Sequence, residues 1–158
     1  MSQPIEAMSD VDLLGVMVGS KAASRMLKDA GGSLSTLLTP SIASYDPQPK
    51  VATKLQAAKE LVRRSLAEAL RHRDCLSSPA TVRDYLRVTL EARHNEVFLV
   101  VFLDSQNRLI AAEEMFRGTL TQTSVYPREV VKRSLLLNAA AVLFAHNRGH
   151  DSKTLIVR

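Results

Sequence analysis

Four side chains in the second half of the chain are of types that hold metal ions or move protons. Glu96 stands directly before an apolar run, and His146 ends a later apolar run. His150 and Asp151 follow His146 after a short interval. Imidazole and carboxylate groups are ligands that zinc takes, and a carboxylate can also accept a proton as a general base. These residue types permit a metal site, although nothing in their spacing requires one.

Each of the four residues also has a plain structural interpretation. Glu96 alone indicates an exposed charge at the beginning of a strand. His146 alone indicates a histidine at the end of a strand, with a backbone hydrogen-bond partner. For His150 and Asp151 we favour a solvated tail, because metal binding depends on the number and geometry of ligands and not on residue type alone.

A hairpin is predicted immediately after Glu96. Residues 97–103 form an apolar run rich in β-branched and aromatic side chains, and its length suits one buried strand. Residues 105–107, Ser-Gln-Asn, supply turn chemistry. Residues 109–116 then return as a second strand.

A helix and a third strand are predicted next. Pro127 suits the first turn of a helix over residues 127–137, since it lacks the N–H that would be unsatisfied there. Asn138 is a helix stop, because asparagine tolerates the left-handed conformation. Residues 139–145 are interpreted as a buried strand that delivers His146 at its end. Alanine favours helix, so a longer helix through Leu143 is the alternative.

The first half of the chain is predicted to be helical. Residues 50–69 carry apolar side chains at helical spacing and form the clearest helix. Shorter helices are predicted after an Asp10 cap, over residues 20–30 and over residues 33–38, and another with Pro79 in its first turn. We therefore expect a helical region over residues 1–73 and an α/β domain over residues 74–158.

Composition limits the class of protein. A chain of 158 residues, 46% of them hydrophobic, suits one domain with a small appendage. The single cysteine, Cys75, cannot form an intrachain disulfide, which fits a reducing cytoplasm, and it is interpreted as a small, partly buried residue. No run is long and apolar enough for a membrane span, and no secretion signal precedes residue 10.

Four motifs in the second half resemble the RadC family, whose members carry a JAB/MPN-type domain. They are Glu-x-Phe-x-x-x-Phe-Leu-Asp over 96–104, Glu-Glu-Met-Phe-x-Gly-Thr over 113–119, Val-Tyr-Pro-Arg-Glu-Val-Val over 125–131 and Leu-Asn-Ala-Ala-Ala-Val-Leu-x-Ala-His-Asn over 137–147. The resemblance covers roughly residues 76–147. It implies a JAB/MPN-like (cytidine-deaminase-like) sheet flanked by helices, the fold of a zinc-dependent metallohydrolase or metallopeptidase associated with DNA repair.

The same resemblance implies roles for individual residues. The family has a glutamate before the first strand that activates a metal-bound water, and Glu96 matches it. Its metal site holds a His-x-His pair and a later aspartate. His146 matches the first histidine, whereas the second falls on Arg148, which stays protonated and has no acceptor for a metal. The aspartate would lie beyond Arg158.

This departure implies a chain that ends, or changes reading frame, inside its own metal motif. One histidine cannot hold zinc, so the family's cofactor is expected not to bind stably, and the hydrolase is expected to be inactive. His150 and Asp151 are the substitutes that could enter a rebuilt site with His146. The alternative function is a non-catalytic DNA- or protein-binding module that keeps the fold. A chain without the cover beyond Asn147 is also expected to expose an apolar edge and to self-associate.

Contact with DNA is a separate expectation. The net charge of +5 and the pI near 9.7 permit binding to a polyanion. Arg63, Arg64 and Arg71 form the candidate nucleic-acid patch, although a solvated helix face is the commoner reason for such a cluster. The first region also resembles the helix-hairpin-helix region of RadC proteins, but its loop over 45–50 has two prolines and no glycine pair.

Overall fold

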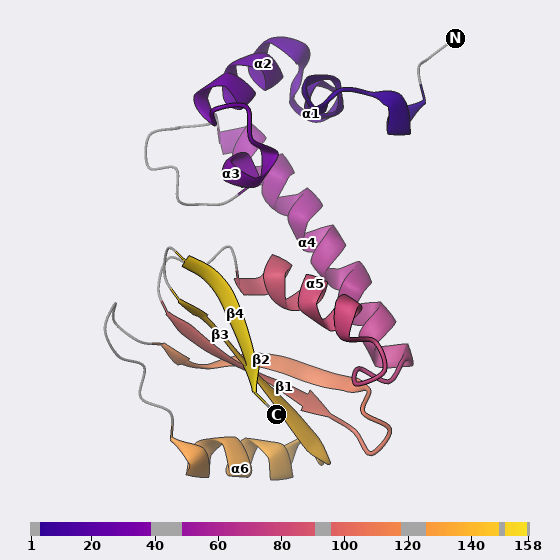
Figure 1. The fold of residues 1–158 in the computed structure, drawn as a ribbon, viewed down its shortest axis with the longest axis vertical. Helices are drawn as coiled ribbons and strands as arrows, with labels where there is room; N and C mark the ends of the chain where they lie inside the picture. Colours follow the sequence, from indigo (N-terminus) through magenta and orange to yellow (C-terminus); the bar gives the residue numbers. More distant parts are fainter. Residues whose placement is uncertain (1–3, 39–48, 91–95, 118–125, 149–150, 158) are drawn as a thin grey trace. The chain divides into compact units, whose positions relative to one another are not determined.

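The computed structural model describes residues 4–38, 49–90, 96–117, 126–148 and 151–157. The chain forms two compact units, Met1–Glu60 and Leu61–Arg158, and the division between them falls inside a long helix, α4 (Pro49–His72). Figure 1 labels the helices and strands along the chain. None of the described helices is long and apolar enough to cross a membrane.

The first unit is helical, as predicted. It contains a short 3-10 helix, η1, and three α-helices before α4, whose bounds are η1 (Ile5–Ala7), α1 (Asp10–Val18), α2 (Ser20–Asp29) and α3 (Leu34–Leu38). Leu14, Ala23 and Met26 are buried together, and Val51 and Leu55 from the first half of α4 pack against them. The predicted Asp10 cap is wrong, because Ser9 is the cap and its hydroxyl accepts a hydrogen bond from the Asp12 N–H at 3.2 Å.

The second unit is built on one antiparallel sheet of mixed α/β architecture. Its strands are β1 (Val97–Leu103), β2 (Leu109–Arg117), β3 (Ala141–Arg148) and β4 (Asp151–Val157), in the spatial order β2-β1-β3-β4. The strand over 97–103 and the hairpin that follows it are confirmed. The alternative of a helix through Leu143 is wrong, because that residue lies in β3 opposite Val101.

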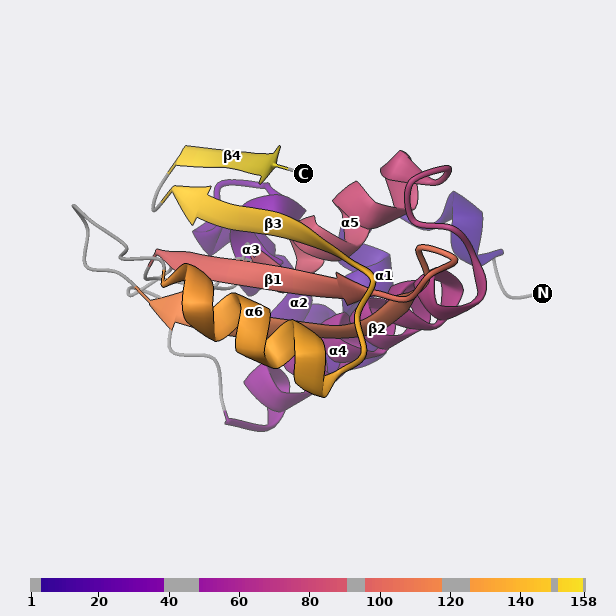
Figure 2. The same cartoon turned by 90° about the horizontal axis from the view of Figure 1, so that it is seen from below.

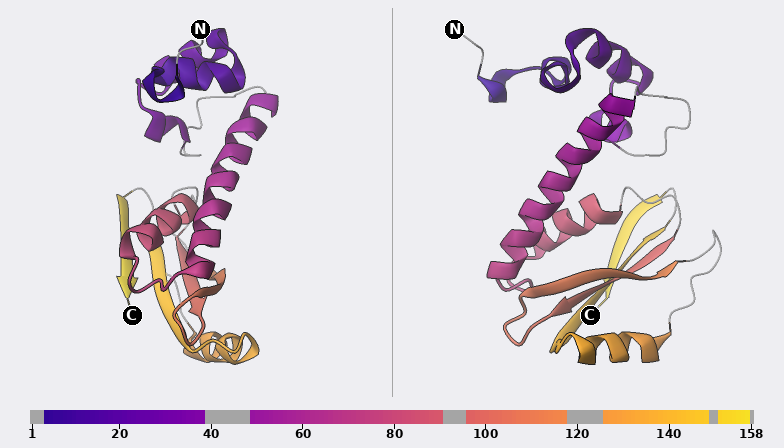
Figure 3. Two further views of the ribbon diagram at one scale, coloured as in Figure 1. Left: turned by 90° about the vertical axis from the view of Figure 1, so that its right-hand side faces the viewer. Right: turned by 180° about the vertical axis from the view of Figure 1, so that it is seen from behind.

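Helices cover both faces of this sheet, as Figures 2 and 3 show. The helix α5 (Pro79–Leu90) lies over one face and α6 (Pro127–Leu136) over the other. Because side chains alternate along a strand, β1 sends Val97, Leu99, Val101 and Leu103 to the first face and Val100 and Phe102 to the second. Covering on both faces explains why 97–103 is an unbroken apolar run.

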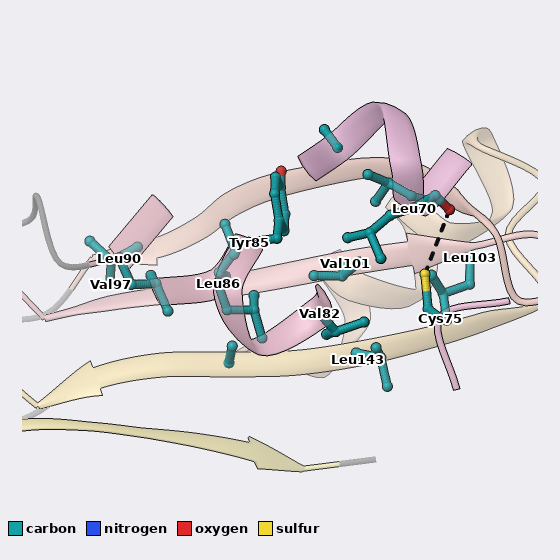
Figure 4. Close-up of a cluster of buried hydrophobic side chains, with 14 residues drawn as sticks. Leu70, Cys75, Val82, Tyr85, Leu86, Leu90, Val97, Val101, Leu103 and Leu143 are labelled. Atoms are coloured by element: carbon teal, nitrogen blue, oxygen red, sulfur yellow. Dashed lines mark hydrogen bonds between the residues drawn. The ribbon is translucent and has the colours of Figure 1, made fainter. Parts of the chain in front are cut away.

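The larger core lies between the first face of the sheet, α5 and the end of α4 (Figure 4). It buries Leu70 from α4, Leu86 and Leu90 from α5, and Leu103 from β1. Cys75 belongs to it and donates from its thiol to the Leu70 carbonyl at 3.8 Å. Burial, with a smaller contribution from Asp74, raises the pKa of the Cys75 thiol. The thiol is therefore a packing group, as the sequence predicts, and not a nucleophile.

Local hydrogen bonds and positive φ angles define the turns around the sheet. Asp104 accepts hydrogen bonds from the N–H groups of Gln106 and Arg108 at 2.8 and 2.9 Å, which closes the hairpin between β1 and β2. These bonds, first among them the one from the Arg108 N–H, hold the pKa of Asp104 below its ordinary value. Asn107 and Asn138 adopt positive φ angles of 58° and 50°, which ends the turn and α6 where the sequence predicted them to end.

One expectation about the end of the chain is wrong. Asp151 was expected in a solvated tail, but it begins β4, which pairs with β3 through Ala145↔Ile156 and His146↔Leu155. β4 is thus an edge strand of the sheet, and the expected exposed apolar edge and self-association stay predictions. The run Thr154 to Val157, three of whose four residues are β-branched, is the sequence signal for this strand. His150 lies outside the described residues.

A bidentate ion pair holds α6 against the sheet. Arg133 of α6 donates from Nε and Nη2 to the two carboxylate oxygens of Glu113 in β2, at 2.7 and 2.6 Å. The hydrogen bonds from Arg133 lower the pKa of Glu113, and those to Glu113 raise the pKa of Arg133. Val130, one turn earlier, is buried against Val100 and Phe102. The pair therefore fixes the rotation of α6 around its apolar contact.

We predict that Glu113→Gln destabilises the fold at neutral pH by about 0.5–1 kcal/mol, since the pair is partly exposed. The pKa of Glu113 lies below its ordinary value of 4.5, so the contribution is present above that pH and is lost as the pH falls through the lower, folded pKa. Urea unfolding of both chains between neutral and acidic pH should show the difference shrinking towards acid. Arg128→Gln, which removes an exposed pair in the same helix, is the control and should change little. A Glu113→Gln effect that grows as the pH falls would contradict the assignment.

Candidate functional site

Glu96 and His146 lie at the same end of the central pair of strands. Glu96 directly precedes β1 and is half-buried. His146 is half-buried in β3, and its register partner in β1 is Phe98, two residues after Glu96. The pairing of β1 with β3 thus brings together two residues that are fifty positions apart in the sequence. The structure thus establishes that Glu96 and His146 share a location at one end of the sheet.

An aromatic cluster lies beside His146. Phe98, directly opposite His146, packs against Phe144 and Phe116 with ring centroids 5.5 and 6.0 Å apart. Tyr126, just before α6, meets the edge of Phe116 at 5.9 Å. Since Phe144 and His146 are two residues apart in one strand, both face the α6 side of the sheet. The surroundings of His146 on that face are therefore apolar.

Asn147 links the two strands at the point where the candidate residues lie. It is the buried polar residue of the described chain, with 7% of its surface exposed. Its side-chain oxygen accepts a hydrogen bond from the Val97 N–H at 2.7 Å. The bond joins the residue that follows His146 to the residue that follows Glu96. The side chain takes the place that a strand carbonyl would occupy, at the position where the β1–β3 ladder ends.

The remaining metal-site candidates are less well placed. Arg148 is the last residue of β3 and pairs with Asp151 of β4, beyond a register shift that follows His146. Within the described ranges, no group of three or more His, Cys, Asp or Glu side chains is arranged to hold a metal ion. Among the described candidate residues, His146 is therefore the one that could serve as a histidine ligand, whereas a catalytic zinc usually takes three protein ligands.

The predicted nucleic-acid patch lies on α4. Arg64 and Arg71 are exposed and about two helical turns apart, so they share a side of the helix, whereas Arg63 is half-buried. Arg63 and Arg64 already take part in interactions within the chain. Of the predicted helix-hairpin-helix loop, residues 45–48 lie outside the described residues.

Sequence reasoning missed one residue at this end of the sheet, Asn147, and one that holds α6 on the sheet, Glu113. Asn147 was noted only as the residue after a histidine, although a buried amide is a strong sign of a required hydrogen bond. Glu113 was read only as part of a family motif, although an acidic residue in a half-buried strand calls for a cationic partner such as Arg133. Both partners are distant in sequence, so neither pairing has a local signal.

Comparison of the sequence with protein families identifies a family for the second unit. The sequence model of the RadC-like JAB domain matches residues 76–155, which include the whole sheet apart from the last two residues of β4. The described domain is therefore of the JAB class, a class of fold associated with metal-dependent hydrolysis. The chain belongs to the RadC family.

Relatives extend the similarity to most of the chain. A UPF0758 protein of Thiobacillus denitrificans is 46% identical over 158 aligned residues, which cover 93% of this chain and 70% of the relative. The UPF0758 protein of Chromobacterium violaceum is 44% identical with the same coverage. That of Nitrosospira multiformis is 59% identical over 99 residues, covering 63% of this chain and 44% of the relative. No solved structure matches the chain significantly.

We predict that Asn147→Ala destabilises the second unit by about 1–3 kcal/mol, because the buried Val97 N–H loses its acceptor. Amide hydrogen exchange should show the Val97 N–H slow in the unaltered chain and fast in the variant. The Val101 amide, deep in the same strand, is the internal control and should stay slow in both. Unchanged protection of Val97 in the variant would mean that the Asn147 side chain does not hold it.

Proposed function

We propose that this chain is a RadC-type metallohydrolase domain whose hydrolytic centre is incomplete, so that it is not an efficient hydrolase. The observation that carries the proposal is Arg148, which stands two residues after His146, at the position of the second histidine in the family's His-x-His pair. The proposal keeps Glu96 as the family's catalytic glutamate and His146 as one metal ligand.

The chemistry of the donors supports this proposal. A catalytic zinc takes about three protein ligands and keeps one position for water. A guanidinium stays protonated at any physiological pH, so Arg148 offers no lone pair. In the family's motif this position supplies a metal ligand, so a fixed positive charge there would oppose metal binding. Glu96 and His146 alone leave the ion short of ligands.

The shared position of Glu96 and His146 supports the choice of a hydrolase ancestor over a purely structural domain. When zinc is bound in such a site, it lowers the pKa of a bound water so that a carboxylate can remove its proton. Glu96 lies at the end of the sheet where that proton acceptor is needed, one residue before the hydrogen bond between Val97 and Asn147. The substrate class proposed from the family is a peptide or protein, and the compartment proposed from the single cysteine is the cytoplasm.

We predict that the purified chain binds zinc at far below one ion per molecule, as measured by elemental analysis after dialysis. Arg148→His supplies a second imidazole at the family's spacing and should raise zinc affinity at least about tenfold. Arg148→Gln removes the same positive charge without adding an imidazole. It therefore distinguishes the effect of an added ligand from the effect of removing charge repulsion against the zinc ion. It should raise the affinity less than Arg148→His does.

One combined result would contradict the proposal. Stoichiometric zinc in the unaltered chain, together with a peptidase activity that Glu96→Gln abolishes, would overturn the proposal. In that case, His150→Ala and Asp151→Asn would identify the residues that rebuild the site. Glu96→Gln is suited to this test because it keeps the size of the side chain and removes its ability to accept a proton.

The alternative function is a non-catalytic module that keeps the JAB fold and binds DNA, in keeping with the family's association with DNA repair. The exposure of Arg64 and Arg71 on one side of α4 favours testing it. Binding that rests on phosphate contacts should be weak, independent of sequence and steeply dependent on salt.

We predict that replacing Arg63, Arg64 and Arg71 together by alanine weakens any DNA binding and flattens its salt dependence, as measured by fluorescence anisotropy with duplexes of two unrelated sequences. Replacing the exposed Arg25 and Lys28 of α2 is the control for loss of positive charge alone. Binding that survives both high salt and the triple replacement would reject the patch. No binding at low salt would reject the DNA alternative.

A further inference from the structure

The helix α6 has a second apolar side that its own sheet does not cover. Its inner side buries Val130, with 6% of its surface exposed. Its outer side exposes Val131, Leu135 and Leu136 at 57%, 73% and 67%. Figure 2 shows α6 lying across β1 and β2, with its outer side turned away from the sheet.

The outer residues follow the spacing of a helix that packs against another helix. Arg128, Val131, Lys132, Leu135 and Leu136 are all exposed, and they lie at positions i, i+3, i+4, i+7 and i+8. That spacing forms one stripe along an α-helix. We define these five residues as the outer stripe of α6. A ten-residue helix with apolar residues on both sides is built to contact two neighbours, one of which is the sheet.

The charges of the outer stripe are positive. Arg128 and Lys132 are exposed within it. The only acidic residue of α6 is Glu129, which lies 3.3 Å from Arg128 and is itself less exposed than that arginine. The charge of Arg133 is directed to Glu113 on the inner side. A partner that covers Val131, Leu135 and Leu136 would therefore meet basic groups at its border.

The size of the stripe limits the partner. A helix of this length is roughly 15 Å long, and its exposed apolar surface is on the order of a few hundred Å². A stable dimer buries about 800 Å² on each partner, which is more than this stripe offers. A second copy would bring the same positive charges, Arg128 and Lys132, to the interface, and Glu129 is the only acidic residue of α6 that could offset them. Both size and charge favour a single helix with acidic residues over a second copy of the chain.

We propose that the outer stripe of α6 is a docking surface for an acidic amphipathic helix of another protein. The apolar side of that helix covers Val131, Leu135 and Leu136, in the manner of helix recognition through residues three and four apart. Its flanking carboxylates lie near Arg128 and Lys132 and fix its direction and its selectivity. The proposal uses no part of the metal site and does not depend on the proposed function.

The test uses two designed peptides of about 18 residues, each with leucines at helical spacing on one side. In one peptide the flanking positions are glutamate, and in the other they are lysine. Binding to the full chain is followed by fluorescence anisotropy of a labelled peptide and by amide chemical shifts of α6. The acidic peptide should bind at least about tenfold more tightly than the basic one, and added salt should reduce this ratio.

Substitutions distinguish specific binding at the outer stripe from non-specific hydrophobic binding elsewhere on the chain. Leu135→Asp should weaken binding of the acidic peptide at least about tenfold, and Lys132→Glu should reduce the preference for the acidic peptide. Leu61→Asp is the matched control, because Leu61 is exposed to 69%, close to the 73% of Leu135, but lies on α4. It should leave binding unchanged. Leu135 is highly exposed, so its replacement should keep the fold, and the thermal unfolding of each variant confirms this.

Four outcomes would overturn the proposal. They are equal binding of the two peptides, no binding of either at millimolar concentration, binding of the acidic peptide that Leu135→Asp leaves intact, and binding that Leu61→Asp abolishes equally. Sedimentation of the chain alone tests whether a second copy of the chain, and not another protein, covers the stripe. A concentration-dependent dimer that Leu135→Asp dissolves would assign the stripe to a second copy.

Discussion

The pairing of β1 with β3 is the interaction on which the second unit depends. β1 is hydrogen-bonded on both edges and packed on both faces, with the α4–α5 core on one side and α6 on the other. Its central residues, Val100 and Phe102, are fully buried. A one-residue slip of this pairing would move every apolar side chain to the wrong face, so the register is strongly fixed. The location of His146 opposite Phe98 follows from that register.

The same register holds the framework of the proposed site in place independently of its ligands. The contact between Asn147 and the Val97 N–H holds the beginning of β1 and uses neither Glu96 nor His146. Glu96 and His146 stay at that end because their strands are held there. Arg148 lies two residues further along β3, where it pairs with Asp151 of β4. In our account, the stability of the second unit therefore does not depend on how many metal ligands the site has.

Much of the second unit could be predicted from the sequence because its signals are local. The apolar run of β1, the turn with Asn107 and the helix between Pro127 and Asn138 each carry residues that prefer the observed backbone. The beginning of β3 was placed two residues too early, since Ala139 still bonds back to Ser134 of α6 and Ala140 bonds to the end of β1 at Leu103. Alanine favours helix over strand, so residues 139–141 carry no local signal for where the strand begins.

What could not be predicted depends on contacts between distant residues. The amide of Asn147 and the carboxylate of Glu113 find partners from other strands and helices. β4 does carry a local signal, the run Thr154 to Val157, but a tail was predicted there because the family's metal motif is broken at Arg148. The outer stripe of α6 is also invisible in the sequence, since Val130 and Val131 are neighbours of the same type and only burial distinguishes them.

The most direct test of this account is anomalous diffraction at the zinc edge from crystals of the unaltered chain soaked in zinc. The account predicts no zinc peak at His146, and it predicts Asn147 hydrogen-bonded to Val97 as in the free chain. Crystals of Arg148→His should show a peak within coordination distance of the histidines at positions 146 and 148. A peak at His146 of the unaltered chain, with two further protein ligands, would contradict the claim that this JAB domain lacks a complete metal centre.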